Sequence, residues 1–172
     1  MSFELQPYLM GRLVILSPLR AEDFEGLYAV ASDPLIWEQH PQKNRYERSI
    51  FESFFKGAMD SGGAFLVTDT ETGEVIGSSR YYEYDAANSS VVIGYTFLAR
   101  KYWGHRHNRE MKHLMLKHAF RFVERVYFHI GENNTRSRKA IEKIGAQYMG
   151  PINFGGSDPS VIYQIDFKAF HA

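Results

Sequence analysis

The chain of 172 residues contains no cysteine. It therefore has no disulfide bond, no thiolate metal ligand and no cysteine nucleophile. This absence fits a reducing compartment, and we expect a cytoplasmic protein. Long apolar runs are missing as well. No stretch approaches the roughly 18 residues of a membrane span, and residues 1–10 do not resemble a signal peptide.

The sequence also lacks an excess of either charge. Its 20 basic and 20 acidic side chains leave no formal net charge at pH 7. Proteins that bind nucleic acids or anionic membranes depend on a strong positive field. We therefore expect no nucleic-acid partner and no membrane partner.

What is present is typical of an ordinary globular protein, with 44% hydrophobic and 23% charged residues. The length suits one domain covering residues 1–172. Predicted strands and helices alternate, and short turns join the central strands, which favours antiparallel pairing. The expected fold class is therefore α+β, with a mixed, mainly antiparallel central sheet flanked by helices.

Periodicity and turn residues place the elements along the chain. The strongest helix is predicted at 108–125, and residues 155–159 are expected to form a loop. Apolar residues line one side of this helix, and six polar residues are expected to face water: Arg109, Glu110, Lys112, Lys117, Arg121 and Glu124. The predicted strands are 12–16, 65–69, 75–84, 91–98, 126–130, 147–152 and 161–167, and the other helices are 22–31, 46–59 and 136–143.

The loop at 99–107 joins an apolar strand to this long helix. The first turn of a helix has unpaired N–H groups and a positive dipole end, so such a junction can bind phosphate. Gly104 allows close backbone approach, and Arg100, Lys101 and Arg106 add positive charge. The alternative is an ordinary strand–helix turn, because short glycine motifs are weak signals. A P-loop is disfavoured because no Gly-Lys-Ser/Thr ending is present.

A second segment also joins a strand to a helix. It reads NTRS at 134–137 and EKIG at 142–145, whereas the first loop reads KYWGHR at 101–106. Together they resemble the GNAT acetyltransferase superfamily, whose members have [QR]-x-x-G-x-[GA] before one helix and Asn-x-x-[SA] at the start of the next. The resemblance covers roughly residues 11–150.

The beginning of the chain is similar to one GNAT subgroup, the ribosomal-protein alanine N-acetyltransferases. Residues 12–38 match its opening, and residues 73–104 match its central hairpin. Three positions depart from the superfamily pattern. Lys101 stands first in the loop, and Arg106 stands where a small residue is usual. Ile141 replaces the tyrosine acid of many members.

The resemblance implies a GNAT-like fold and direct acetyl transfer to a primary amine of a protein N-terminus or a small molecule. Acetyl-CoA would be the cosubstrate, and no metal is expected. A backbone N–H of the strand 91–98 would stabilise charge on the thioester oxygen. In the subgroup, the serine matching Ser137 is a proposed proton donor to the leaving thiolate. The implied CoA-binding residues are Phe97, Leu98, Trp103, Gly104, His105, Arg106, His107, Asn108, Asn134 and Ser137.

The base that takes the proton of the amine is His129, which titrates in the right range, or Glu83. The catalytic candidates are thus Ser137, His129 and Glu83, and each has a structural alternative. Ser137 and Asn134 could cap their helix, His129 could be a buried structural histidine, and Glu83 could be solvated. Four aromatic residues could line a substrate pocket or fill the core: Trp37, Tyr81, Tyr82 and Tyr95.

Two alternatives concern the whole chain. Its clustered histidines lie on different helix faces or in the loop and lack carboxylate partners at ligand spacing, which argues against a metal site. These histidines are His105, His107, His113 and His118. A domain of the same fold could also bind acyl-CoA without turnover, as a sensor or scaffold, and release of the CoA thiol distinguishes the two functions. The partners expected are acetyl-CoA and an amine, and a homodimer is left open.

Overall fold

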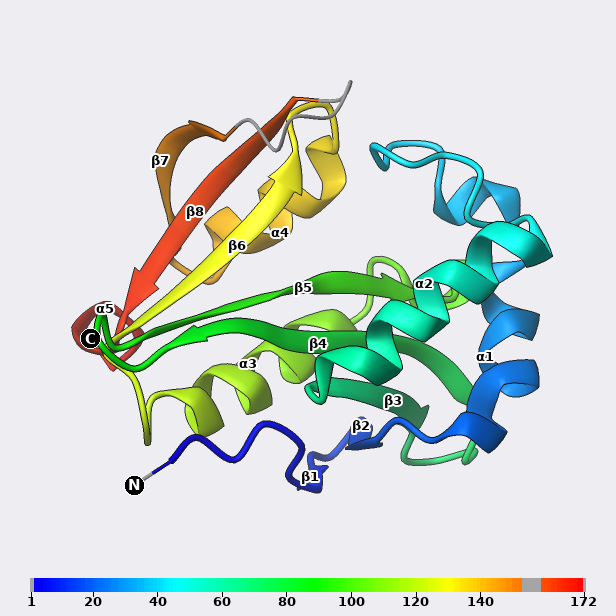
Figure 1. Ribbon diagram of the computed structural model, residues 1–172, viewed down its shortest axis with the longest axis horizontal. Coiled ribbons are helices and arrows are strands. Elements are labelled where there is room, and N and C mark those ends of the chain that lie inside the picture. Colours follow the sequence, from blue (N-terminus) through cyan, green and yellow to red (C-terminus); the bar gives the residue numbers. More distant parts are fainter. Residues whose placement is uncertain (1, 153–158, 172) are drawn as a thin grey trace.

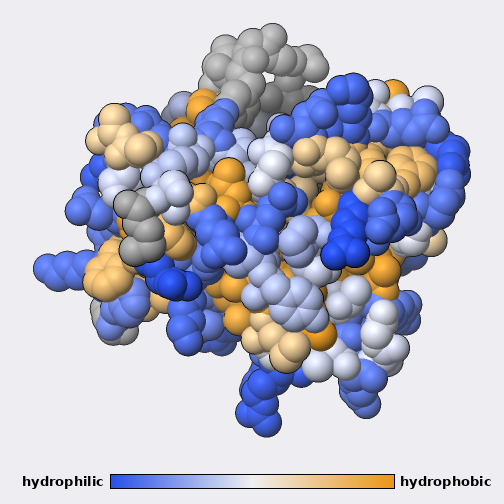
Figure 2. Space-filling model, turned by 60° about the horizontal axis from the view of Figure 1, so that its bottom comes forward, coloured by the Kyte–Doolittle hydropathy of each residue, from blue (hydrophilic) through white to orange (hydrophobic). Residues whose placement is uncertain are grey.

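The computed structural model describes residues 2–152 and 159–171. The loop predicted at 155–159 lies outside the described residues except for Pro159. None of the described helices has the length and apolar composition that crossing a bilayer requires. On the face drawn in Figure 2, apolar side chains form small patches between hydrophilic ones.

One eight-stranded sheet forms the centre of the fold, in the order β1-β2-β3-β4-β5-β6-β8-β7 (Figure 1). Neighbouring strands are antiparallel except β5 and β6, which are parallel. This is the mixed, mainly antiparallel sheet that the sequence predicts. The strands are β1 (Leu9–Met10), β2 (Val14–Pro18), β3 (Ala64–Asp69), β4 (Val75–Asp85), β5 (Ser90–Leu98), β6 (Arg125–Gly131), β7 (Gln147–Ile152) and β8 (Ser160–Asp166).

Helices flank the sheet, and the core consists of two apolar clusters. Residues of α1 and α2 form one cluster with Trp37 and Phe97, whereas α3 and α4 contribute Met115 and Ile141 to the other. The helices are α1 (Phe24–Ala31), α2 (Arg48–Ser61), α3 (His107–Ala119), α4 (Thr135–Lys143) and α5 (Phe167–Phe170), with 3-10 turns η1 (Ala21–Asp23), η2 (Pro34–Ile36) and η3 (Arg100–Tyr102).

Strand β3 contributes residues to both clusters. Phe65 and Val67 belong to the α3 and α4 cluster, and Ala64 and Leu66 to the α1 and α2 cluster. Successive residues of a strand point to opposite faces of the sheet. The two clusters therefore lie on opposite faces, and an uninterrupted apolar run is what a strand covered on both sides requires.

The helix predicted at 108–125 ends earlier, at Ala119. The amides of Glu124 and Arg125 both donate to the Ser89 carbonyl, at 3.0 and 3.1 Å, and so lead the chain into β6. Phe120 and Val123 remain buried within the intervening turn. The apolar pattern therefore continues past the end of the helix, which is why periodicity overestimates its length.

Other boundaries differ less. The sequence does not predict β1, and the strand predicted at 12–16 is β2, which continues to Pro18. Helix 22–31 begins with the 3-10 turn η1, and helix 46–59 corresponds to α2. The strand predicted at 161–167 ends at Asp166, whose carboxylate accepts a hydrogen bond from the Ala169 amide and starts α5.

Glu110 and Lys112 correct the predicted solvent face of α3. The Glu110 carboxylate accepts hydrogen bonds from the amides of Leu13 and Val14, at 2.7 and 2.8 Å, and so ties β2 to the helix. Lys112 is only 5% exposed. Its Nζ donates to Thr96 Oγ1 at 2.6 Å. Burial lowers the pKa of Lys112 to about 7, because the charged form loses hydration.

Replacing Lys112 with methionine should stabilise the protein, most strongly at low pH. Between pH 7 and the unfolded pKa of about 10.4, the unfolded chain binds a proton that the folded protein lacks. The destabilisation caused by Lys112 is therefore complete below pH 7 and fades as the pH rises. We expect Lys112→Met to gain roughly 1–4 kcal/mol at pH 6 and less at pH 9, measured by urea unfolding.

Lys117→Met is the matched control, because Lys117 lies on the same helix and is exposed. Its unfolding free energy should stay close to that of the wild type at both pH values. A gain from Lys112→Met that does not depend on pH would contradict this account of the buried lysine.

Candidate active site between strands β5 and β6

Strands β5 and β6 pair only along their first halves. Their parallel register joins Ser90–Ile93 to Arg125–Phe128, although β5 continues to Leu98 and β6 to Gly131. Beyond that point the two strands diverge (Figure 1). Among the described residues, the edge of β5 at residues 94–98 that faces β6 therefore has no partner strand. A gap opens where an extended ligand can meet the backbone of β5.

A bulge in β5 accompanies this separation. From Ser78–Phe97 to Arg80–Gly94 the register moves two residues along β4 but three along β5. Tyr95 lies within the extra length and has a φ of 52°, which side chains other than glycine rarely adopt. A bulge bends its strand and locally disrupts the ladder. The bulge thus turns β5 away from β6 at the gap.

The loop before α3 supplies amide donors near one end of this gap. No acceptor within the described chain is in hydrogen-bonding reach of the amides of Gly104, Arg106, His107 and Asn108. Gly104 has a φ of +78°, and no described atom lies within 4 Å of where its Cβ would be. Together with the positive end of the α3 dipole, these amides form a site suited to a phosphate group.

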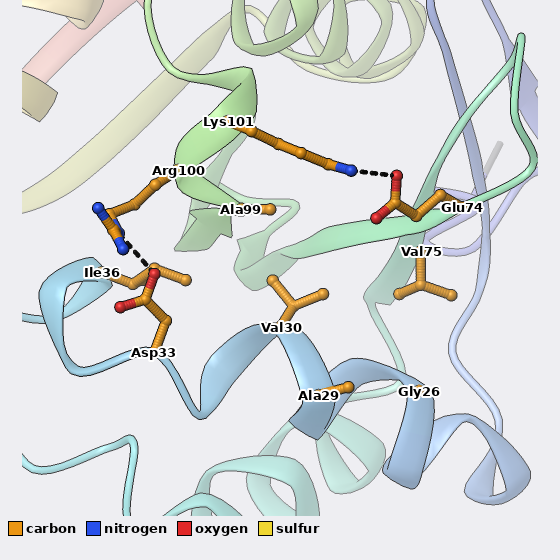
Figure 3. Close-up of a pocket in the computed structure, with 10 residues that line it drawn as sticks. All are labelled: Gly26, Ala29, Val30, Asp33, Ile36, Glu74, Val75, Ala99, Arg100 and Lys101. Atoms are coloured by element: carbon orange, nitrogen blue, oxygen red, sulfur yellow. Dashed lines mark hydrogen bonds and ion pairs between the residues drawn. The ribbon is translucent and has the colours of Figure 1, made fainter.

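The basic residues of the loop are arranged differently from the prediction. Arg100 pairs with Asp33, and Lys101 pairs with Glu74 at 2.7 Å. Both ion pairs line a hollow of about 720 Å³ next to α1 (Figure 3). Arg106 is exposed and makes no ion pair with a described residue. Of the three basic residues, only Arg106 keeps an uncompensated charge.

The two histidines of the loop differ. His105 is exposed, whereas the His107 ring is mostly buried and its Nε2 lies 3.0 Å from Asp69 Oδ1. The pKa of Asp69 is lowered mainly by the hydrogen bond from the Thr72 amide and further by His107. The His107 side chain therefore fastens the loop to β3, and its backbone amide is the group that remains available to a ligand.

Trp103 connects the loop to α4. Its indole N–H donates to the Leu98 carbonyl at 2.9 Å, and the Arg136 guanidinium stacks over its ring, 3.4 Å from the centroid. Phe97 is buried against Trp37, with ring centroids 4.9 Å apart. The predicted positions 97, 98 and 103 thus lie at the end of β5, but the Phe97 side chain belongs to the core.

Asn134 is buried and caps α4. Its side-chain oxygen accepts from the Ser137 amide at 3.3 Å. Asn134 therefore caps its helix, which is the structural role that the sequence left open for it. Ser137 is the third residue of the helix and is half-buried, and its hydroxyl makes no hydrogen bond to a described residue. Because Asn134 does the capping, the Ser137 hydroxyl is not needed for it.

His129 and Glu83 lie on the other side of the gap, in the direction of α2. His129 Nδ1 is 3.2 Å from the Tyr82 hydroxyl, and the Tyr82 and Tyr95 rings are 5.1 Å apart. Burial lowers the pKa of His129, opposed by the charge of Glu83, which is exposed. A neutral imidazole can accept a proton at pH 7. The two predicted bases are therefore coupled, because the charge of Glu83 raises the pKa of His129. The Tyr82 hydroxyl contacts the His129 ring.

The four aromatic residues separate into two groups. Trp37 and Tyr81 are buried core residues, so they do not line the gap. Tyr82 is half-buried and Tyr95 is 41% exposed on the α2 side. Within the described chain no group of three or more histidine and carboxylate side chains is arranged to hold a metal ion.

Sequence reasoning missed three cations around the gap. The Lys112 ammonium contacts Thr96, where β5 has left β6, and lies 5.8 Å from the centre of the Phe128 ring, where the pairing ends. Arg80 of β4 is buried, and Arg45 precedes α2. Helical spacing could have indicated Lys112, which is four residues before buried Leu116. No comparable signal marks the arginines, because their surroundings depend on the packing of α2.

Several solved structures of acetyltransferases are similar to this one. A GCN5-related N-acetyltransferase from Brucella melitensis has a TM-score of 0.82 at 22% identity, over 97% of this chain and 81% of that one. Mycobacterium smegmatis RimJ in complex with CoA-disulfide has a TM-score of 0.71 at 19% identity, over 90% and 82%. Spermidine N-acetyltransferase from Vibrio cholerae, in complex with CoA and spermine, scores 0.72 at 16% identity, over 94% and 100%.

These identities are low, so the likeness concerns the fold alone. The comparison with curated proteins gives no significant match. The family is shown by a different comparison: the family model of the acetyltransferase (GNAT) domain matches residues 13–147, which is most of the chain. The chain therefore belongs to the GNAT acetyltransferase family.

Proposed function

We propose that the protein, as one domain, transfers an acetyl group from acetyl-CoA to a primary amine. The observation that carries this proposal is the gap between β5 and β6. It has free amides of the α3 loop on one side and the Tyr82–His129 pair on the other. A ligand can thus be held by its phosphates while its reactive end reaches a proton acceptor.

The residues present fit acyl-CoA. The amides of Gly104, Arg106, His107 and Asn108 would bind the pyrophosphate, and the open space at Gly104 permits close approach. Trp103 and the backbone at Phe97 and Leu98 would border the pantetheine arm, and Asn134 and Ser137 would face it from α4. Acetyl-CoA supplies an acetyl group activated as a thioester.

Groups of the chain itself would then take the proton of the amine and stabilise the negative charge that develops on the thioester. His129 would take the proton of the attacking amine, directly or through water, assisted by the charge of Glu83. A free backbone N–H of β5 would donate to the thioester oxygen as its negative charge grows. The Ser137 hydroxyl would donate to the departing sulfur. Ile141 stands at the position of the tyrosine acid of many family members, but its buried aliphatic side chain has no proton to donate. Membership of the ribosomal-protein alanine N-acetyltransferase subgroup is part of this proposal.

Replacing Gly104 with valine should weaken CoA binding at least tenfold, or about 1.4 kcal/mol. The φ of +78° disfavours a β-branched residue, and the new side chain would fill the space left for the phosphates. Gly62→Val is the matched control, because Gly62 has a similar φ of +64° at the end of α2. Calorimetry showing equal CoA affinity in folded Gly104→Val protein and the wild type would contradict the site.

Removing the Ser137 hydroxyl should lower kcat by tenfold or more, with little change in CoA affinity or melting temperature. An interaction made mainly in the transition state affects turnover and not ground-state binding. Stability should hold because Asn134 caps the helix. The measurement is thiol release from acetyl-CoA by Ser137→Ala, with Thr135→Ala as the control that removes a neighbouring hydroxyl. A destabilised Ser137→Ala protein with wild-type turnover would contradict the catalytic role of Ser137.

The same assay separates transfer from the second candidate function, an idle acyl-CoA sensor. Buried Ile141 favours that candidate, since many family members have a tyrosine acid at this position. A protein that binds CoA but releases no thiol with any amine tested would be such a sensor.

A further inference from the structure

Two arginines share the same aromatic rings on the α2 side of the gap. The Arg80 guanidinium lies 3.8 Å from the centre of the Tyr95 ring and 5.2 Å from that of Phe54. The Arg45 guanidinium lies 5.0 Å from the centre of Phe54 and 5.8 Å from that of Tyr95. Both positive charges therefore converge at the bulge where β5 leaves β6.

Neither arginine pairs with an acid of the described chain. No carboxylate of these residues comes within 4.0 Å of either guanidinium. Among the residues that the structure describes, Arg80 donates only to the Phe54 carbonyl, at 3.4 Å, and Arg45 only to the Gln42 side chain, at 3.0 Å. Arg80 is 6% exposed. Charged residues are almost never so buried unless they are paired, so the surroundings of Arg80 favour a negatively charged partner.

The electrostatics agree with the geometry. Burial and, to a smaller extent, the charge of Arg80 together lower the pKa of Arg45 to about 10, and Tyr95 opposes this shift. The pKa of His40, next to Trp37, is lowered to about 3, first by burial and then by Arg45 and Arg136. Burial is the main cause of both shifts, and a neighbouring guanidinium adds to each, which an anion bound there would offset.

Arg48 shows the contrast within the same region. Its guanidinium also lies over aromatic rings, 5.1 Å from the centre of Phe24 and 5.3 Å from that of Tyr28. Unlike the other two, it is exposed and pairs with Glu25. Stacking on aromatic residues therefore does not by itself explain why Arg45 and Arg80 have no acid.

We propose that Arg45 and Arg80 bind an anionic group of the acceptor, a carboxylate or a phosphate. The acceptor is then a molecule that carries both a primary amine and an anion, and cationic amines such as polyamines are poor substrates. The planar guanidinium suits this role because its N–H groups match the oxygens of either anion. This inference rests on the proposed acetyl transfer, since it concerns the acceptor side of the same gap.

The location explains why the anion would orient the amine. Arg80 pairs in register with Gly94, the residue before Tyr95, and its guanidinium lies over the Tyr95 ring, so its charge lies at the bulge of β5. His129 lies across the gap and contacts Tyr82, whose ring packs on Tyr95. An acceptor anchored at the arginines would therefore present its amine near the proton acceptor.

The test compares matched amines by thiol release from acetyl-CoA. The pairs are phenylalanine with phenethylamine and phosphoethanolamine with ethanolamine, and spermidine is added as a polycation. For the wild type, kcat/KM should be at least tenfold higher for the anionic member of at least one pair. The pair that shows the preference tells whether a carboxylate or a phosphate is recognised.

Arginine variants then identify the source of the preference. Arg80→Gln and Arg45→Gln should each remove most of it through a higher KM for the amine that carries the anion, and leave kcat/KM for the partner without the anion nearly unchanged. Arg45 is half-buried, so its variant keeps the test valid if Arg80→Gln does not fold. Arg48→Gln is the control and should retain the full preference.

Three outcomes would overturn the inference. Spermidine and the amines without an anionic group could be the better substrates of the wild type. The arginine variants could lower activity equally on both members of a pair. In both cases acetyl transfer itself stands. If no amine releases thiol although CoA binds, the proposed function fails and this inference fails with it.

Discussion

The separation of β5 from β6 is the constraint on which the rest of the site depends. A parallel pair would normally be satisfied along its whole length, but the bulge at Tyr95 bends β5 away after Ile93. Backbone groups that would have paired with each other become available to a ligand. The same divergence links the loop before α3 to the side on which Tyr82 and His129 meet. Phosphate binding and proton transfer can therefore occur along one ligand.

Buried positive charge is the second organising feature, and it reduces stability. Lys112 lies at the vertex of the gap on the α3 side, and Arg80 and Arg45 lie on the α2 side. The loop residues Arg100 and Lys101, by contrast, are paired with acids. Uncompensated ionisable groups gather at functional sites more often than elsewhere. Their distribution here follows the gap, although a neutral core would be more stable.

The sequence predicts the elements that depend on local patterns. The apolar run of β3, the stripe of α3 and the free amides around Gly104 follow from periodicity and helix-end chemistry, which act over a few residues. The end of α3 is misplaced because Ser89, distant in sequence, captures the amides of Glu124 and Arg125. The charges of Arg45 and Arg80 are likewise invisible to local patterns, since only the packed α2 brings them to Tyr95.

A crystal structure with bound CoA would show whether the gap between β5 and β6 holds the cosubstrate. We expect the pyrophosphate on the amides of Gly104, Arg106, His107 and Asn108 and the sulfur between β5 and β6, near Ser137. The hollow beside α1, lined by Arg100 and Lys101, would be left empty. Pyrophosphate bound in that hollow, or a sulfur outside the gap between the two strands, would contradict this expectation.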